Sequence, residues 1–125
     1  MKIYSVSISS RDPDTGEIEI IMGSRFRNIK EIAWHPTVEM LSVKGDEWTV
    51  THIPTGLAIA FFNNKHKARR FALLVREFDW DFTDQEFSDY KPEALRAFKE
   101  WLIKIILKVE TGEMDDKKKV GSNTR

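Results

Sequence analysis

Residues 47–78 constrain the fold of this chain more than any other stretch, because they predict two strands, a tight turn and a helix in direct succession. Residues 47–52 alternate between large and small side chains, as a strand with two different faces does. Pro54 and Gly56 then supply the backbone conformations of a short turn. Residues 57–62 are apolar on both faces, which is typical of a strand inside a sheet. The stretch therefore predicts a hairpin that leads into a helix.

The helix that follows is predicted over residues 65–78, with Asn64 as its N-cap. Apolar residues recur on one face at about 100° per residue. That face consists of Ala68, Phe71, Ala72, Val75 and Phe78. Leu73 falls instead among charged residues, where the pattern of a buried face does not place an apolar side chain.

The N-terminal residues predict a second hairpin. Along residues 2–9, Tyr4, Val6 and Ile8 alternate with serines, and the turn-forming residues 11–16 separate this strand from the next. In the returning strand, residues 17–22, three side chains are expected to face inward. These are Ile18, Ile20 and Met22.

The segment between the two hairpins is open to two interpretations. Its apolar spacing suggests a short helix starting at Asn28, whereas the residues around Phe26 could equally be extended. Pro36 ends either structure, because the residue before a proline avoids the helical conformation. A strand over residues 38–43 follows, and residues 44–46 turn it into the strand that contains Trp48.

The last predicted helix spans residues 92–110 and stops near Gly112. Ile103 and Leu107 lie outside its apolar face and stack on the far side of the helix. Residues 113–125 are polar and charged and are expected to form a flexible tail after a single domain at residues 1–112. The chain is therefore predicted to be α+β: an antiparallel sheet of about five strands covered by two C-terminal helices.

Composition narrows the class of protein. The chain has 125 residues, and its 20 lysines and arginines balance 20 aspartates and glutamates. That balance argues against a protein that binds nucleic acid or membrane with its whole surface, but it allows a local basic patch. The absence of cysteine excludes disulfides, thiolate metal sites and cysteine nucleophiles. No apolar run is long enough for a membrane span or a signal peptide, so we expect a cytoplasmic protein.

No catalytic signature is present in the sequence. The three histidines do not have the helical spacing of a metal motif, and there is no glycine-flanked serine elbow or glycine-rich phosphate loop. His52 ends a strand, where a histidine usually bonds the backbone. We therefore expect no enzyme activity, no cofactor and no metal.

Charge is unevenly distributed along the second half of the chain. Residues 65–78 carry five cations and one acid, whereas residues 79–93 carry six acids and one cation. The two blocks could neutralise each other, or the acidic block could mimic a nucleic acid. Alternatively, the start of the basic helix could bind an anion, since helix N-termini favour negative charge. The candidate ligand-binding residues are Asn64, Lys65, Lys67, Arg69 and Arg70.

A further alternative uses Asp79 and Asp81, which project together if their segment is extended. With Asp84 or Glu86 they could hold a hard cation, as the carboxylates of metal-dependent hydrolases do.

The run Asn63-Asn64-Lys65-His66-Lys67-Ala68-Arg69-Arg70 follows three predicted strands. This order broadly resembles the double-stranded-RNA-binding domain, although the glycine-proline-x-histidine loop of that family is missing. The strands and helix of residues 38–78 also resemble AP2-like and integrase arm-binding domains, without their arginine-rich strand faces. Both resemblances imply contact with nucleic acid. Trp48-x-Val50-x-His52-x-x-Thr55-Gly56 with Asp79-Trp80 is similar to small bacteriophage accessory proteins, which implies binding or inhibition of a host component.

We therefore expect a non-enzymatic binding protein, of the phage-type inhibitor or sequestering kind, in the host cytoplasm if a phage encodes it. Its partner would be a host protein or a small anionic ligand. Self-association would use the misplaced apolar residues Leu73, Ile103 and Leu107. The alternatives are a nucleic-acid-binding module built on helix 65–78 and a metal-dependent hydrolase.

Overall fold

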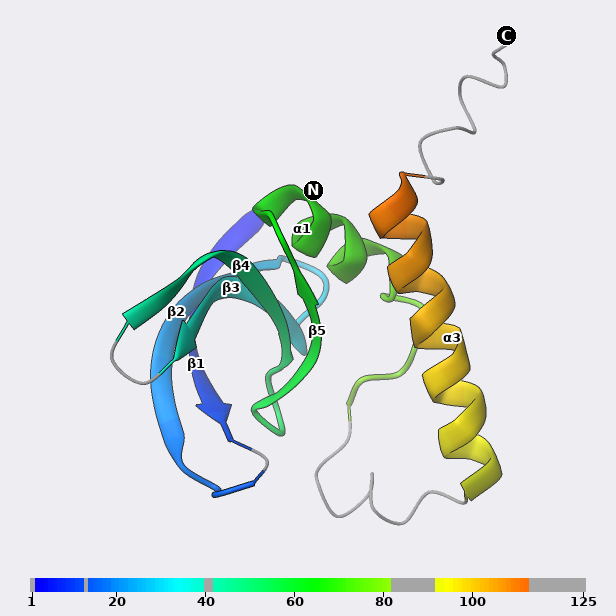
Figure 1. Cartoon of the computed structure of the whole chain (residues 1–125), viewed down its shortest axis with the longest axis horizontal. Coiled ribbons are helices and arrows are strands. Elements are labelled where there is room, and N and C mark those ends of the chain that lie inside the picture. Colours follow the sequence, from blue (N-terminus) through cyan, green and yellow to red (C-terminus); the bar gives the residue numbers. More distant parts are fainter. Residues whose placement is uncertain (1, 13, 40–41, 82–91, 113–125) are drawn as a thin grey trace, which may run out of the picture. The chain divides into compact units, whose positions relative to one another are not determined.

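The computed structural model describes residues 2–12, 14–39, 42–81 and 92–112. A five-stranded antiparallel sheet is followed by two C-terminal helices, which confirms the predicted α+β class (Figure 1). The elements are β1 (Ile3–Arg11), β2 (Ile18–Phe26), β3 (Ile32–Glu39), β4 (Ser42–His52), β5 (Leu57–Phe62), α1 (Lys65–Leu74) and α3 (Pro92–Thr111). Contacts divide the chain into two compact units, Met1–Tyr90 and Lys91–Arg125. The expectation of a single domain over residues 1–112 stays a prediction.

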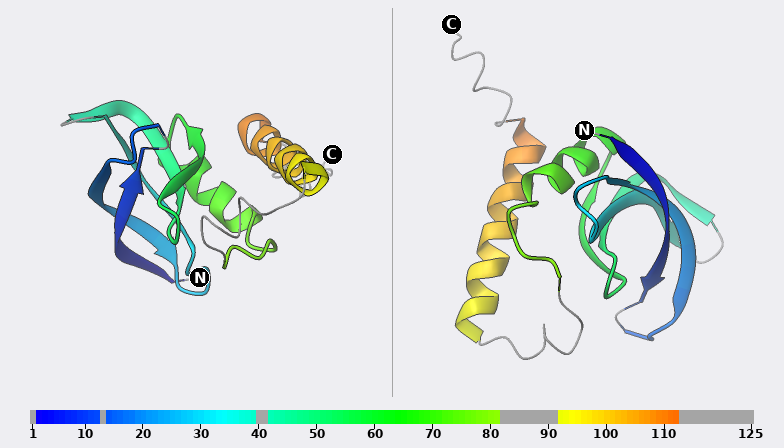
Figure 2. Two further views of the ribbon diagram at one scale, coloured as in Figure 1. Left: turned by 90° about the horizontal axis from the view of Figure 1, so that it is seen from below. Right: turned by 180° about the vertical axis from the view of Figure 1, so that it is seen from behind.

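The strands pair in sequence order, each antiparallel to the next. The sheet curls strongly, so that β1 approaches the turn between β4 and β5 (Figures 1 and 2). The N–H of Arg11 donates to the carbonyl of Gly56 at 2.8 Å, which joins the two ends of the sheet at this point. The sheet therefore has a concave inner face and a convex outer face.

The inner face of the sheet is closely packed and partly polar. Ile8 and His35 are buried there beside Gly23, whose hydrogen atom faces the Ile8 side chain. A Cβ at position 23 would lie 2.9 Å from the carbonyl oxygen of Trp34. Thr51 is fully buried and bonds to the His35 ring, while the hydroxyls of Thr37 and Thr49 are 2.6 Å apart. Thr49 and Thr51, which alternate with Trp48 along β4, thus belong to a buried layer.

The main apolar core lies between the outer face of β3–β5 and helix α1. The core side chains of α1 are Ala68, Phe71 and Ala72, as the helical pattern predicted. Phe71 packs against Phe62 with ring centroids 5.3 Å apart. Trp34 and Phe26 continue the same layer, with centroids 4.9 Å apart. This packing fixes α1 on the sheet and therefore fixes the position of its basic side chains.

The predicted helix over residues 65–78 is too long, because α1 ends at Leu74. The last carbonyl groups of a helix have no partner within the helix, so they need other donors. The Arg76 guanidinium donates to the Leu73 carbonyl at 2.6 Å, and the Trp80 indole donates to the Val75 carbonyl at 2.8 Å. Residues 75–78 consequently form turns rather than a further helical turn.

The orientation predicted for the second strand is wrong. Register places Ile20 opposite Ser9 and Met22 opposite Ser7, so these residues share the outer face with the serines. Ile18, Ile20 and Met22 are 60%, 69% and 63% exposed. The inner positions of β2 are Ile21, opposite the buried Ile8, and Gly23. A shift of one residue moves every side chain of a strand to the other face, and Ile8 decides which face is buried here.

The boundaries predicted between residues 36 and 46 are wrong, because β3 continues through Pro36 to Glu39 and β4 covers the whole of residues 42–52, including the predicted turn at 44–46. The suggested helix starting at Asn28 is absent, because residues 27–31 form turns and β3 begins at Ile32. The last helix agrees closely with its predicted range: α3 ends at Thr111, and Gly112 takes a φ of 73°. Residues 113–125, the predicted tail, lie outside the described residues.

Candidate functional site

The start of α1 is built as the sequence predicted. The Asn64 side chain accepts a hydrogen bond from the backbone N–H of Lys67 at 2.9 Å, which caps the helix. The first turn contains no acidic residue. Cations therefore occupy the end of the helix where the dipole favours negative charge, so this end is strongly electropositive.

Two cations of α1 lie on aromatic rings of the sheet. The Lys65 ammonium is 5.9 Å from the ring centroid of Trp48, and the Arg69 guanidinium carbon is 5.8 Å from that of Phe26. Residues four apart on a helix share a face, so Lys65 and Arg69 are held side by side along the sheet. Cation–π attraction of this kind stabilises an exposed cation by about 0.5–1 kcal/mol.

The open end of the β1–β2 hairpin brings more cations to the same region. Tyr4 pairs with Arg25 across the two strands, and the N–H of Arg27 donates to the Lys2 carbonyl at 2.9 Å. The Arg25 guanidinium donates to the carbonyl groups of Phe26 and Arg27 at 3.1 and 3.0 Å. Arg25 is thereby fixed in place, while Lys2 and Arg27 are exposed.

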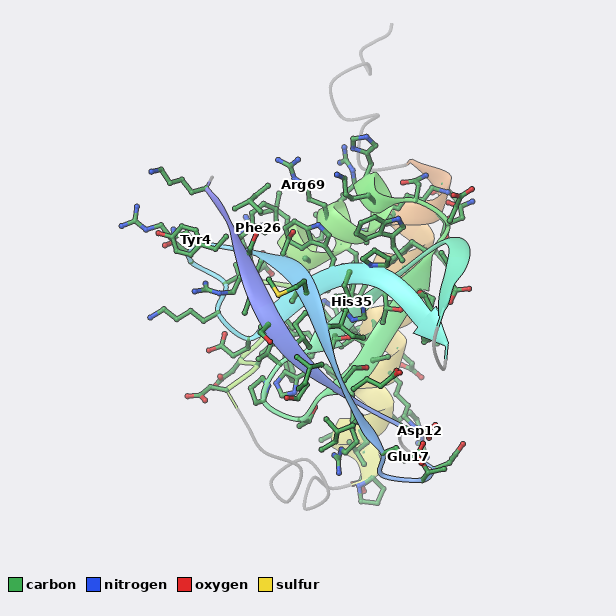
Figure 3. All side chains as sticks on the ribbon, turned by 90° about the vertical axis from the view of Figure 1, so that its left-hand side faces the viewer. Tyr4, Asp12, Glu17, Phe26, His35 and Arg69 are labelled. Carbon is green, nitrogen blue, oxygen red and sulfur yellow. The ribbon has the colours of Figure 1, made fainter. Side chains whose placement is uncertain are left out.

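Phe26 belongs to the hairpin and lies under Arg69, whereas its neighbour Arg25, like Ile21 and Gly23, points to the other face of β2. The two sets of cations therefore share one end of the sheet but approach it from its two faces. We call this charged end of the sheet the basic face, and it consists of Lys2, Arg25, Arg27, Lys65 and Arg69. Figure 3 shows Tyr4, Phe26 and Arg69 at one end of the sheet and Asp12 and Glu17 at the other. About 25 Å of strand separates the two ends, since each strand residue adds about 3.3 Å.

The opposite end of the hairpin is acidic. Its turn contains Asp12, Asp14 and Glu17, and Glu19 follows in β2. The Asp12 carboxylate accepts hydrogen bonds from the N–H groups of Asp14 and Thr15 at 2.7 and 3.2 Å, which is the bonding of an ordinary turn. One hairpin thus carries opposite charges at its two ends.

The structure extends the predicted site beyond the helix. Of the predicted ligand-binding residues, Asn64 caps α1, and Lys65 and Arg69 lie on the basic face. Lys67 is half-buried and Arg70 is exposed. Sequence reasoning missed Lys2, Arg25 and Arg27, although the alternation Arg25-Phe26-Arg27 at a strand end could have indicated them. Most of residues 79–93 lies outside the described residues, so whether that segment neutralises α1 stays open.

The buried histidines have structural partners. The two ring nitrogens of His52 bond to the Thr55 hydroxyl at 2.9 Å and to the Trp80 carbonyl at 2.5 Å. This pair of bonds ties the segment after α1 to the sheet, in agreement with the predicted backbone-bonding role. His35 bonds to the Pro36 carbonyl and the Thr51 hydroxyl at 2.9 and 2.8 Å. Burial lowers the pKa of His35 below its ordinary value of 6.5, against a smaller opposite effect of its bond to Pro36.

The carboxylates of the hydrolase hypothesis are exposed. The Asp79 side chain accepts a hydrogen bond from the N–H of Asp81 at 3.1 Å. Among the residues that the structure describes, no group of three or more histidines, aspartates or glutamates could hold a metal ion. Asp84 and Glu86, the other ligands of that hypothesis, lie outside the described residues.

The residues predicted for self-association differ in exposure. Leu73 is half-buried, whereas Ile103 and Leu107 are each 56% exposed on α3. A role of these three residues in self-association stays a prediction.

A scan against protein-family models, a search of curated proteins and a search of solved structures found no match to this chain. In the described part of the chain, no helix is long and apolar enough to cross a membrane. A host-protein partner, a small anionic ligand and a phage-type inhibitory role stay predictions.

Proposed function

We propose that this protein is a non-enzymatic binding protein that holds the phosphate backbone of a nucleic acid on its basic face. The observation that carries the proposal is that two sets of cations share one end of the sheet, one from the β1–β2 hairpin and one from α1 (Figure 3). The predicted module used helix 65–78 alone, and the hairpin adds Lys2, Arg25 and Arg27 to it.

Several features support phosphate as the ligand group. Arg25 and Arg69 are arginines, whose guanidinium groups bind phosphate oxygens in a bidentate way. Lys65 and Arg69 are held along the sheet by aromatic rings, so little side-chain freedom remains to be lost on binding. Because the acids of the hairpin lie at its far end, they repel phosphates only weakly at the basic face.

The proposal predicts binding that depends steeply on salt. A fluorescently labelled 20-nucleotide DNA or RNA is titrated with the protein, and anisotropy is measured at 50 and 200 mM salt. If three to five cations contact phosphates, affinity falls roughly 20- to 500-fold over this range, because bound cations release counterions from the nucleic acid. Arg69→Glu should weaken binding and flatten the dependence on salt.

Lys104→Glu is the matched control, because it makes the same change in net charge outside the basic face. Equal losses in Arg69→Glu and Lys104→Glu would show that only overall charge matters and would contradict the proposal. Absence of binding to DNA and RNA at 50 mM salt would refute it directly.

A further inference from the structure

Tyr4 is an exposed aromatic residue within the basic face. It is 40% exposed, and the Arg25 guanidinium carbon lies 5.3 Å from its ring centroid. Two backbone carbonyl groups hold that guanidinium in place. The ring is therefore supported on one face by a fixed cation, while much of its surface remains accessible to a ligand.

The other rings that carry cations are less accessible. Phe26 is only 3% exposed and Trp48 is half-buried, so both rings offer a ligand less surface than Tyr4 does. Phe61 is 55% exposed, but it lies on β5, outside the β1–β2 hairpin. In the described part of the chain, no cation lies over its ring. Tyr4 is thus the ring that combines exposure with charge.

The neighbours of Tyr4 fit a ligand that offers both phosphates and flat rings. Lys2 precedes it by two residues, just before β1, and the N–H of Arg27, just after β2, donates to the Lys2 carbonyl. A nucleobase stacked on Tyr4 would place its own backbone beside these cations. Single strands can present such bases, whereas the bases of a duplex are stacked inside it and out of reach of an exposed ring.

The following inference rests on the proposed function. We propose that the basic face binds single-stranded nucleic acid and that Tyr4 is the platform on which one base stacks. Lys2, Arg25 and Arg27 hold the phosphates on either side of that base. Sequence preference is expected to be small, because every base offers a flat face for stacking.

The test compares Tyr4→Ala and Tyr4→Phe with the unaltered protein. Anisotropy is measured with a labelled 20-nucleotide single strand of mixed sequence and with the duplex of the same sequence, at one fixed salt concentration. Tyr4→Ala should weaken single-strand binding roughly 5- to 150-fold, and Tyr4→Phe should restore most of it, because the stacking surface is kept. Any binding of the duplex should be unchanged by Tyr4→Ala.

Ile20→Ala serves as the control, since Ile20 is also exposed on this hairpin but has no ring. As a second measurement, ultraviolet cross-linking of the unaltered protein to a single strand of thymidines, followed by mass spectrometry, should identify the peptide that contains Tyr4. This measurement does not depend on whether a variant folds.

The two proposals can fail separately. If Arg69→Glu weakens binding but Tyr4→Ala leaves single-strand affinity unchanged, the stacking role is wrong and phosphate binding survives. Tighter binding of the duplex than of the single strand, or a cross-link confined to other peptides, would also overturn the inference. If neither probe binds, the proposed function fails and takes this inference with it.

Discussion

His35 is a buried titratable residue with a partner for each ring nitrogen. It is 2% exposed on the inner face of the sheet, between the Pro36 carbonyl and the Thr51 hydroxyl. The carbonyl can only accept, so Nδ1 carries the proton and donates to Pro36. In the neutral ring Nε2 then accepts a hydrogen bond from Thr51. Both nitrogens are satisfied without a charge, and burial disfavours the protonated form.

This environment predicts that the folded protein loses stability in mild acid. The pKa of His35 is lowered below 6.5 in the folded state, so below pH 6.5 the unfolded chain binds a proton that the folded chain does not. The contribution is fully present above pH 6.5 and is lost as the pH falls toward the lower folded pKa. Urea denaturation at pH 7.5 and pH 5.5 measures the loss.

His35→Gln is the comparison for this measurement, because glutamine keeps a donor and an acceptor but does not titrate in this range. The variant should be less stable at pH 7.5 and should lose less stability on acidification. An equal loss in both proteins would assign the effect to other groups.

At the scale of elements, the closure of the sheet depends on a glycine. Gly56 has a φ of 75°, and the Arg11 N–H bonds to its carbonyl. A Cβ at Gly56 would overlap the Ser9 carbonyl oxygen, so both the backbone conformation and the space at this position require glycine. Gly16, in the β1–β2 turn, has nearly the same φ of 79° but nothing within 4 Å of a Cβ.

The pair Gly56→Ala and Gly16→Ala separates these two requirements. Gly16→Ala should lower the free energy of unfolding by about 1–2 kcal/mol, the cost of a left-handed conformation for a residue with a Cβ. Gly56→Ala should cost roughly 1–3 kcal/mol more, because the overlap pushes β1 away from the β4–β5 turn. Thermal or urea denaturation gives both values, and equal costs would mean that the sheet adjusts freely at its closure.

Much of the fold could be predicted from sequence at this scale, since alternation, turn residues and helical spacing identified the β1–β2 and β4–β5 hairpins and both helices. The β3–β4 hairpin was misplaced, because the turn predicted at residues 44–46 lies inside β4. The outer face of β2 could not be predicted. Ile18, Ile20 and Met22 alternate perfectly, and alternation identifies a face without saying which side is buried. The buried side of β2 is set by Gly23, which lies against both Ile8 of β1 and His35 of β3.

The candidate site was predicted in part for a similar reason. Lys65 and Arg69 follow a strong N-cap and are recognisable as a basic helix start. Arg25 and Arg27 come to the same end of the sheet as α1 because Phe26, which lies between them in β2, packs under Arg69. The sequence does not show this contact between distant segments, so Lys2, Arg25 and Arg27 were recognised only in the structure.

At the scale of the whole molecule, the predicted self-association concerns α3. Ile103 and Leu107 stack one turn apart and are each 56% exposed. If this pair joins two copies, Ile103→Asp should convert a dimer into a monomer, because a buried unpaired carboxylate opposes association. Light scattering measures the mass. Phe61→Asp is the matched control, because Phe61 is an apolar residue on β5 whose side chain is 55% exposed. A monomeric unaltered protein would contradict the prediction.

The separation of charge within the β1–β2 hairpin has a consequence for kinetics. The chain has a formal net charge of zero, yet the β1–β2 hairpin carries Lys2, Arg25 and Arg27 at one end and Asp12, Asp14 and Glu17 at the other. The hairpin therefore carries an electric dipole of its own. In the field of a polyanion it experiences a torque that turns its positive end forward before any contact forms. Encounter is therefore oriented, and the rate of productive collisions rises without any net attraction between the two molecules at long range.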